Sequence, residues 1–149
     1  AKIFSLSLTC AQSRIRLIFK GESPRYFEEA QKQNLNSVTF AAAEKVAMLA
    51  KEKNAERVVM IDVDGLCSYT EAIIVCAGRS TRQVQAIADH IAKSMKQEGS
   101  GTIGIEGMEH GQWVLVDLND VVVHVFYEPV REYYNIEHIW PEAKITVFD

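Results

Sequence analysis

The amino-acid sequence predicts one α/β (α+β) domain, in which helices pack over one face of a mixed β-sheet. The main observation is the order of the sequence patterns, which runs helix, strand, strand, helix, strand, strand, helix. The second is composition: of 149 residues, 48% are hydrophobic and 24% are charged, enough apolar side chain for one buried core. No uncharged apolar run reaches the roughly 18 residues that a membrane helix needs.

The N-terminal part of the chain has a different composition from the rest. Residues 1–37 carry six Lys and Arg against three Asp and Glu, whereas residues 38–149 carry ten against seventeen. The stretch from Lys2 to Lys20 has no acidic residue, which is typical of an organelle transit peptide, and the alternative is an extension without function. A short helix is expected at about Pro24–Lys32. We therefore divide the chain into an extension of unknown role, residues 1–37, and a compact domain, residues 38–149.

The first half of the compact domain contains two helices and two strands. Val38–Asn54 is rich in alanine and places its apolar residues on one face of a helix. Arg57–Val63 and Glu71–Ala77 are β-branched, apolar runs of strand length. Thr81–Glu98 has a helical apolar stripe, and Ser80 is placed to cap its first turn.

The second half begins with a glycine-rich connection, residues 99–111. Trp113–Leu118 and Val121–Phe126 follow as two apolar runs separated by two turn-forming residues, which predicts a hairpin. The remaining elements are short: helical turns at Glu128–Tyr134 and Glu137–Trp140, and an edge strand at Lys144–Phe148.

One pattern resembles an enzyme site. Gly78-Arg79-Ser80 lies at a strand-to-helix turn, where exposed backbone amides can bind phosphate, as in nucleotidyltransferases. Such an enzyme needs carboxylates soon after the turn to hold magnesium. The next acidic residue is Asp89, inside the helix, and Asp62 and Asp64 precede the turn. The turn is therefore interpreted mainly as structural, with nucleotide binding kept as the alternative.

Other chemical patterns are weaker. Asp117, Asp120 and His124 lie near one hairpin and could act as acid and base, but Asp120 is more simply a turn former and His124 a satisfied or half-buried histidine. Cys76 lies in an apolar strand and is expected to be inert, whereas Cys67 lies in a turn. The cysteines and histidines show no metal-ligand spacing. We expect no catalytic activity, no metal and no cofactor.

The last third of the chain combines acidic charge with aromatic side chains. From Glu98 onward it has ten Asp and Glu, and only Arg131 and Lys144 are basic. This charge disfavours direct binding to nucleic acid and favours a basic protein partner. The aromatic and arginine side chains are of the types that anchor protein interfaces, the alternative being that they complete the core. They are Trp113, Phe126, Tyr127, Arg131, Tyr133, Tyr134 and Trp140.

Ordered motifs over about Phe40 to Ala143 resemble the ribosomal silencing factor family, also called Iojap. They are VMIDV at 59–63, AGRSTRQV at 77–84, IAD at 87–89, EG at 106–107, GQWVLVD at 111–117, DVVVHVF at 120–126 and REYYNIE at 131–137, followed by Ile139 and Trp140. The resemblance implies a nucleotidyltransferase-like fold without catalytic carboxylates. It further implies a translational repressor that binds large-subunit ribosomal protein uL14 and blocks joining of the small subunit when nutrients are scarce. It also implies a cytoplasmic protein, with an organelle version left open, and a possible homodimer.

The resemblance also suggests site residues by motif position. The docking region for uL14 would comprise Trp113, Asp117, Asp120, His124, Arg131, Tyr134 and Trp140. Ser80, Arg82 and Gln83 would shape the helix start or form a second surface. Arg79 departs from the family, which usually has a small polar residue there. Two alternatives remain: a nucleotide-binding or nucleotidyltransferase-like enzyme using the Gly78–Ser80 turn, and a module that binds another basic protein.

Overall fold

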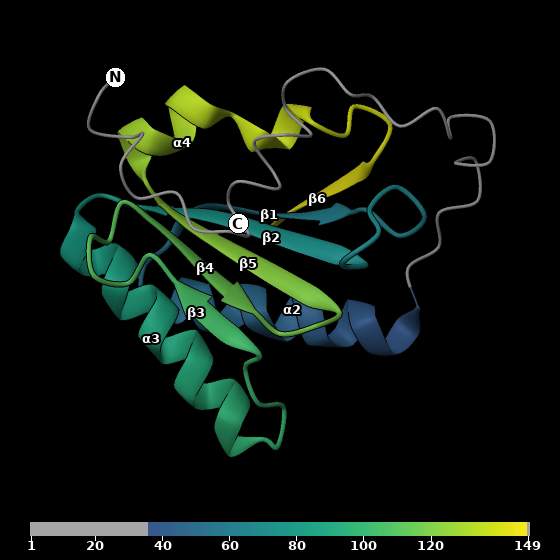
Figure 1. The fold of residues 1–149 in the computed structure, drawn as a ribbon, viewed down its shortest axis with the longest axis horizontal. Coiled ribbons are helices and arrows are strands. Elements are labelled where there is room, and N and C mark those ends of the chain that lie inside the picture. The colour runs from purple at the N-terminus through teal and green to yellow at the C-terminus, as the bar shows by residue number, and fades with distance from the viewer. Residues whose placement is uncertain (1–35, 149) are drawn as a thin grey trace.

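A computed structural model describes residues 36–148 of the chain. They form a six-stranded sheet in the order β3-β4-β5-β2-β1-β6, with helices on it (Figure 1). Strands β2 and β5 are parallel and all other neighbours are antiparallel, so the expected mixed sheet is confirmed. The helix expected at Pro24–Lys32 lies outside the described residues, and the extension of residues 1–37 stays a prediction.

Most elements follow the sequence patterns closely. The strands are β1 (Glu56–Asp62), β2 (Ala72–Gly78), β3 (Gly104–Glu106), β4 (Trp113–Asp117), β5 (Val121–Tyr127) and β6 (Lys144–Phe148). The helices are α2 (Ser37–Glu52), α3 (Thr81–Gln97), α4 (Glu128–Tyr134) and the 3-10 turn η3 (Ile136–His138). Strand β3 was not predicted, because three residues in a glycine-rich connection are too few to show a period.

The helices cover both faces of the sheet, which corrects the expectation of one covered face. Helices α2 and α3 lie on one face, and α4 lies on the other (Figure 1). Strand β2 is buried at all seven positions, so both of its faces need a cover. Helix α4 follows β5 without a loop and supplies part of the second cover.

The face under α2 and α3 is called here the aliphatic face. Its side chains are hydrocarbon apart from thioether and thiol sulfur, and its largest members are branched residues such as Ile74, Ile87 and Ile91. Alternate residues of β5, Val121, Val123 and Val125, point into it, as the period of a strand requires.

The face under α4 is called here the aromatic face. Trp113 and Leu115 of β4 and Val122 and Phe126 of β5 belong to it, together with Trp140. His124 lies between Val122 and Phe126 on the same side of β5, as the alternation predicts. This face therefore holds most of the residues that the family motifs single out.

Candidate functional site

Three of the predicted docking residues meet on the aromatic face. The indole Nε1 of Trp113 donates a hydrogen bond to Nδ1 of His124 at 3.0 Å. The Trp113 ring also lies 4.8 Å from the ring of Tyr134 and 4.9 Å from that of Phe126, measured between ring centroids. The pairing of β4 with β5 places Trp113 opposite Phe126, so the hairpin assembles this cluster and α4 adds Tyr134.

His124 is fully buried, and its burial lowers its pKa to about 3. Because Nδ1 accepts the indole hydrogen, the neutral ring carries its proton on Nε2. No described residue accepts a hydrogen bond from that Nε2. A buried, neutral imidazole without an acidic partner cannot exchange protons with a substrate, so His124 acts as a packing and hydrogen-bonding residue.

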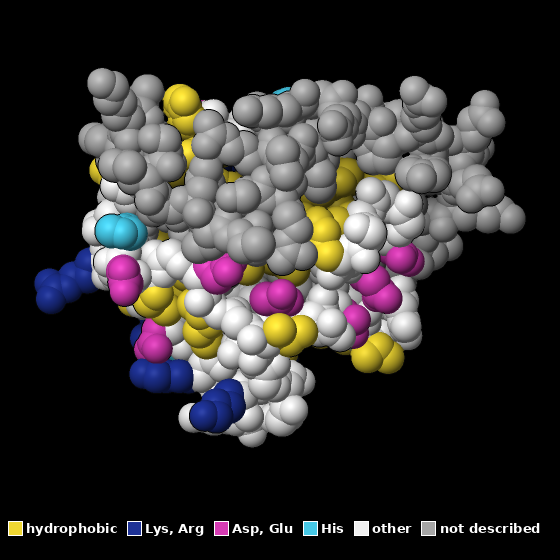
Figure 2. All heavy atoms as spheres, in the orientation of Figure 1, with side chains coloured by type: hydrophobic (Ala, Val, Ile, Leu, Met, Phe, Trp, Pro, Cys, Tyr) yellow, Lys and Arg dark blue, Asp and Glu magenta, His cyan; other side chains and the backbone are white. Residues whose placement is uncertain are grey.

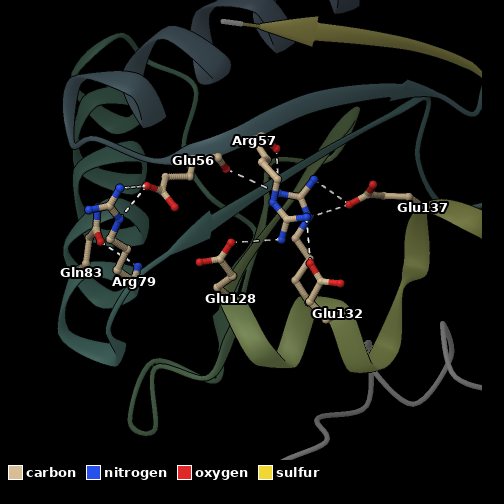
Figure 3. A network of polar contacts seen from close by, with 8 residues as sticks. Glu56, Arg57, Arg79, Gln83, Glu128, Glu132 and Glu137 are labelled. Atoms are coloured by element: carbon tan, nitrogen blue, oxygen red, sulfur yellow. Dashed lines mark hydrogen bonds and ion pairs between the residues drawn. The ribbon is translucent and has the colours of Figure 1, made fainter.

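Arg131 lies elsewhere on α4 and is also buried, with 4% of its surface exposed. Its Nε and Nη2 each lie 2.6 Å from Oε1 of Glu137, which belongs to η3 (Figure 3). Its Nη1 donates to the backbone oxygen of Arg57 at 2.7 Å. Arg57 lies near the start of β1 with a φ of 48°, where the β1–β2 register shifts, so Arg131 ties α4 to an irregular position of that strand.

More exposed ion pairs surround this buried arginine. The Arg57 guanidinium lies 2.9 Å from Glu132 and 3.5 Å from Glu128, both on α4 (Figure 3). Arg79 lies 2.6 Å from Glu56. Exposed pairs of this kind contribute little to stability, because solvent screens them. These pairs lie at the carboxyl ends of β2 and β5, the edge of the sheet where α/β proteins commonly bind ligands. The chain's own charged side chains therefore occupy that edge.

The Gly78–Ser80 turn is likewise engaged internally. Ser80 Oγ accepts from the backbone N–H of Gln83 at 3.1 Å, and Gln83 Oε1 accepts from that of Arg79 at 2.8 Å. Gln83 Nε2 donates to the backbone oxygen of Asn54, which joins α3 to the end of α2. Ser80 and Gln83 thus shape the helix start, while Arg82 is exposed, and its second-surface role stays a prediction.

The two predicted aspartates lie at the tip of the β4–β5 hairpin. Asp117 Oδ1 accepts from the backbone N–H of Asn119, which has a φ of 75°. Asp117 therefore forms the turn, whereas the sequence reasoning assigned that role to the carboxylate of Asp120. The Asp120 side chain is exposed, and its backbone oxygen accepts from Thr70 Oγ1 at 2.8 Å.

Burial separates the predicted docking residues into three groups. Trp113, His124, Arg131 and Trp140 are at most 7% exposed, Tyr134 and Asp117 are partly exposed, and Asp120 is exposed. A buried side chain offers a partner little area, so the first group can serve docking by holding the surface in shape. Tyr133, 57% exposed and edge-on to Tyr134, is the surface aromatic that sequence reasoning named without singling it out.

The strands β3, β4 and β5 form an acidic half of the sheet. Residues 98–130 contain six Asp and Glu and no Lys or Arg. Figure 2 shows acidic side chains spread over the side where β3 and β4 lie, with Lys and Arg gathered beyond them over α3. Two exposed apolar residues, Ile103 and Ile105, lie at the β3 edge of this half. The sequence did not predict them as surface residues, because isolated isoleucines in a glycine-rich segment form no helical or strand periodicity.

The described residues provide little for metal or thiol chemistry. They contain no group of three His, Cys, Asp or Glu side chains that could hold a metal ion. Burial raises the pKa of the Cys76 thiol to about 12, and burial also raises that of Cys67, so neither forms the reactive thiolate readily. Within residues 36–148, no helix is both long and apolar enough to cross a membrane.

Comparison with known proteins decides the family. A sequence model described as "Ribosomal silencing factor during starvation" matches residues 36–149, which include every described residue. The chain belongs to the ribosomal silencing factor family. Membership confirms the resemblance seen in the motifs, and the buried tryptophan, histidine and arginine described above lie in those motifs.

Bacterial ribosomal silencing factors are similar over most of their length. A Bacillus subtilis member is 40% identical over 106 residues, which are 70% of this chain and 90% of that protein. A Halalkalibacterium halodurans member is 42% identical over 92 residues, 62% of this chain and 79% of that protein. A crystal structure of a Chromobacterium violaceum protein matches with a TM-score of 0.65 and 36% identity, covering 73% of this chain and 92% of that one.

Proposed function

We propose that this chain represses translation by binding the large ribosomal subunit through ribosomal protein uL14, which blocks association with the small subunit when nutrients are limiting. The observation that carries the proposal is membership of a family described as silencing ribosomes during starvation, over the whole described domain. The named partner and the block of subunit joining come from the resemblance of the motifs to that family.

The geometry supports docking rather than catalysis. The amides of Arg79 and Gln83 at the Gly78–Ser80 turn are already hydrogen-bonded within the chain, and Glu56 places a carboxylate beside the same turn. A nucleoside triphosphate would have to displace these contacts against like charge. Measurable magnesium-dependent nucleotide binding would favour the enzyme alternative.

We infer that the partner meets a surface built on the aromatic face and the acidic half of the sheet. Tyr133 supplies exposed aromatic area, and Asp117 and Asp120 supply negative charge. Aromatic anchors within a complementary field are the usual means of fast and specific docking to a basic protein. The buried residues Trp113 and Arg131 fix the position of the elements that carry this surface.

Two further properties go with the proposal. The chain acts where ribosomes are, in the cytoplasm, and an organelle location is the alternative. Before docking it forms a homodimer that competes with ribosome binding. Sedimentation velocity at increasing protein concentration tests the dimer, and addition of uL14 should convert the dimer to a one-to-one complex.

The central test is co-sedimentation of the purified full chain with isolated large subunits, together with direct binding to purified uL14. The variants Tyr133→Ala and Asp120→Lys should bind roughly tenfold more weakly while staying folded, because both side chains lie at the surface. Met48→Ala is the matched control, because Met48 is an equally exposed apolar residue on α2.

The same samples test the block of subunit joining. Light scattering follows the association of large and small subunits, and the unaltered chain should suppress the signal while the weakly binding variants should not. An unaltered chain that stays in the supernatant at micromolar concentration contradicts the proposal. Binding without suppression contradicts only the block of subunit joining.

A further inference from the structure

The sheet has two edge strands among residues 36–148. Strand β3 pairs only with β4, and strand β6 pairs only with β1, among the described residues. The outer backbone groups of an edge strand are available to pair with another chain. Each of these two edges also carries two exposed apolar side chains, so exposure by itself does not distinguish them.

At the β3 edge, Ile103 is 65% exposed and Ile105 is 39% exposed. The backbone N–H of Ile103 donates to the backbone oxygen of Asp117 at 2.8 Å, so the first residue of this edge is already anchored to β4. The register places Gly104 opposite Asp117 and Glu106 opposite Leu115. Within residues 36–148, the inner side of β3 is therefore occupied by β4, and no strand pairs with its outer side.

The segment after β3 is held firmly against α3. Gln85 Nε2 donates to the backbone oxygen of Met108 at 2.8 Å. Gly111 has a φ of 66°, and a Cβ added there would lie 2.6 Å from the backbone oxygen of Thr81, so no other residue fits. These contacts hold the residues between β3 and β4, including Glu109, in a fixed place on the surface.

The charge around β3 selects the kind of partner. Glu106 and Glu109 follow its two isoleucines, Asp117 lies on the neighbouring strand, and no Lys or Arg occurs from residue 98 to 130. A second copy of this chain added at the same edge would bring these carboxylates together, which is unfavourable. An extended segment rich in Lys and Arg would instead meet complementary charge along its whole length.

We propose that the outer edge of β3 accepts an extended basic segment of the ribosomal partner protein as an additional β-strand. The backbone groups of β3 pair with that strand, Ile103 and Ile105 cover its apolar side chains, and the acidic half of the sheet attracts its Lys and Arg. This inference rests on the proposed function. It adds that the partner binds at the β3 edge and that it binds as an added strand.

The test compares the two edges with matched substitutions in the full chain. Ile105→Lys places a repelling charge at the β3 edge, and Val147→Lys places the same charge at the β6 edge, where the valine is 59% exposed. Binding of each to isolated large subunits and to purified uL14 is measured, with circular dichroism to confirm folding. Ile105→Lys should bind roughly tenfold more weakly or worse, and Val147→Lys should bind as the unaltered chain does.

A second readout separates strand addition from a general effect of charge. Backbone amide hydrogen exchange in Ile103–Glu106 should slow when uL14 is bound, because newly paired amides are protected. The inference is overturned if Ile105→Lys binds normally, if only Val147→Lys loses binding, or if exchange in this segment does not change in the complex. An unaltered chain that binds neither large subunits nor uL14 overturns the proposed function itself, and the partner named here falls with it.

Discussion

The two faces of the sheet are built by different means. On the aliphatic face, α2 and α3 pack branched hydrocarbon side chains such as Ile74 and Ile87, none of which needs a hydrogen bond. On the aromatic face, Trp113 donates to His124, and Arg131 reaches a backbone oxygen 74 residues earlier in the chain. The aliphatic face is held by hydrophobic packing, which has no preferred direction. The aromatic face is held in addition by a few hydrogen bonds, which require strict geometry.

This difference indicates how a fold can be stable and still shape a docking surface. Hydrocarbon packing tolerates small adjustments, because its free energy depends mainly on area and volume. A hydrogen bond is lost when its geometry changes, and the residues packed around it then lose their fixed positions. Tyr134, which contacts Trp113 and lies beside the exposed Tyr133, connects the aromatic face to the surface. Changes on this face should therefore affect docking as well as stability.

The largest effect should come from Trp113→Ala. It removes a buried indole and the hydrogen-bond donor of His124, and should lower the free energy of unfolding by about 3–5 kcal/mol. The fraction that remains folded should also dock less well, because Tyr134 loses its ring contact with Trp113. Chemical denaturation followed by circular dichroism measures the first effect, and co-sedimentation measures the second. Trp113→Phe, which keeps a ring, should restore part of both.

Arg131→Met should be nearly as damaging, with a loss of roughly 3 kcal/mol, because it leaves Glu137 and the backbone oxygen of Arg57 without their buried partner. Arg57→Met is the matched control. It removes only exposed ion pairs and should cost at most about 1 kcal/mol. If urea denaturation gives equal losses of unfolding free energy for the two variants, the burial of Arg131 does not account for its contribution to stability.

His124 should make stability depend on pH. Its pKa is about 3 in the folded chain and about 6.5 when unfolded, so below pH 6.5 only the unfolded state takes up the proton. Stability should be unaffected by this group above pH 6.5 and fall toward pH 3 by up to about 1.4 kcal/mol per pH unit. Denaturation at several pH values should show this slope, and His124→Gln should flatten it. An unchanged slope in that variant would assign the acid sensitivity to other groups.

The smallest effect should come from Ile87→Val on the aliphatic face. Removal of one methylene from a packed core costs about 0.5–1.5 kcal/mol. Docking of the folded protein should not change, because Ile87 packs in the aliphatic face, whereas Trp113 and Tyr134 lie on the other face of the sheet. A variant that loses uL14 binding while losing little stability would show that the aliphatic face also shapes the docking surface.

Much of the fold could be predicted from local pattern. The long helix was expected at Thr81–Glu98 and is observed at Thr81–Gln97, and the edge strand Lys144–Phe148 has the expected bounds. Ser80 was expected to cap the helix, and it does. These features depend on residues within one or two turns of each other, where periodicity, capping and strand alternation are visible.

The candidate site was less predictable, because its residues work through distant partners. The motifs pointed to Trp113, His124 and Arg131, but no pattern in the sequence shows that all three are buried. The reach of Arg131 to Arg57 depends on how α4 lies on the sheet. The role of the exposed Tyr133 depends on the same placement.

The sequence by itself determined the elements, their alternation, the acidic charge of residues 98–130 and the family. Each of these follows from residue type and near spacing, which folding does not alter. Only the tertiary structure decided which face each helix covers, which motif residues are buried and that β3 is an edge strand beside acidic side chains. Those properties depend on which segments far apart in the chain pack against the same surface. That arrangement is determined only when the whole molecule packs.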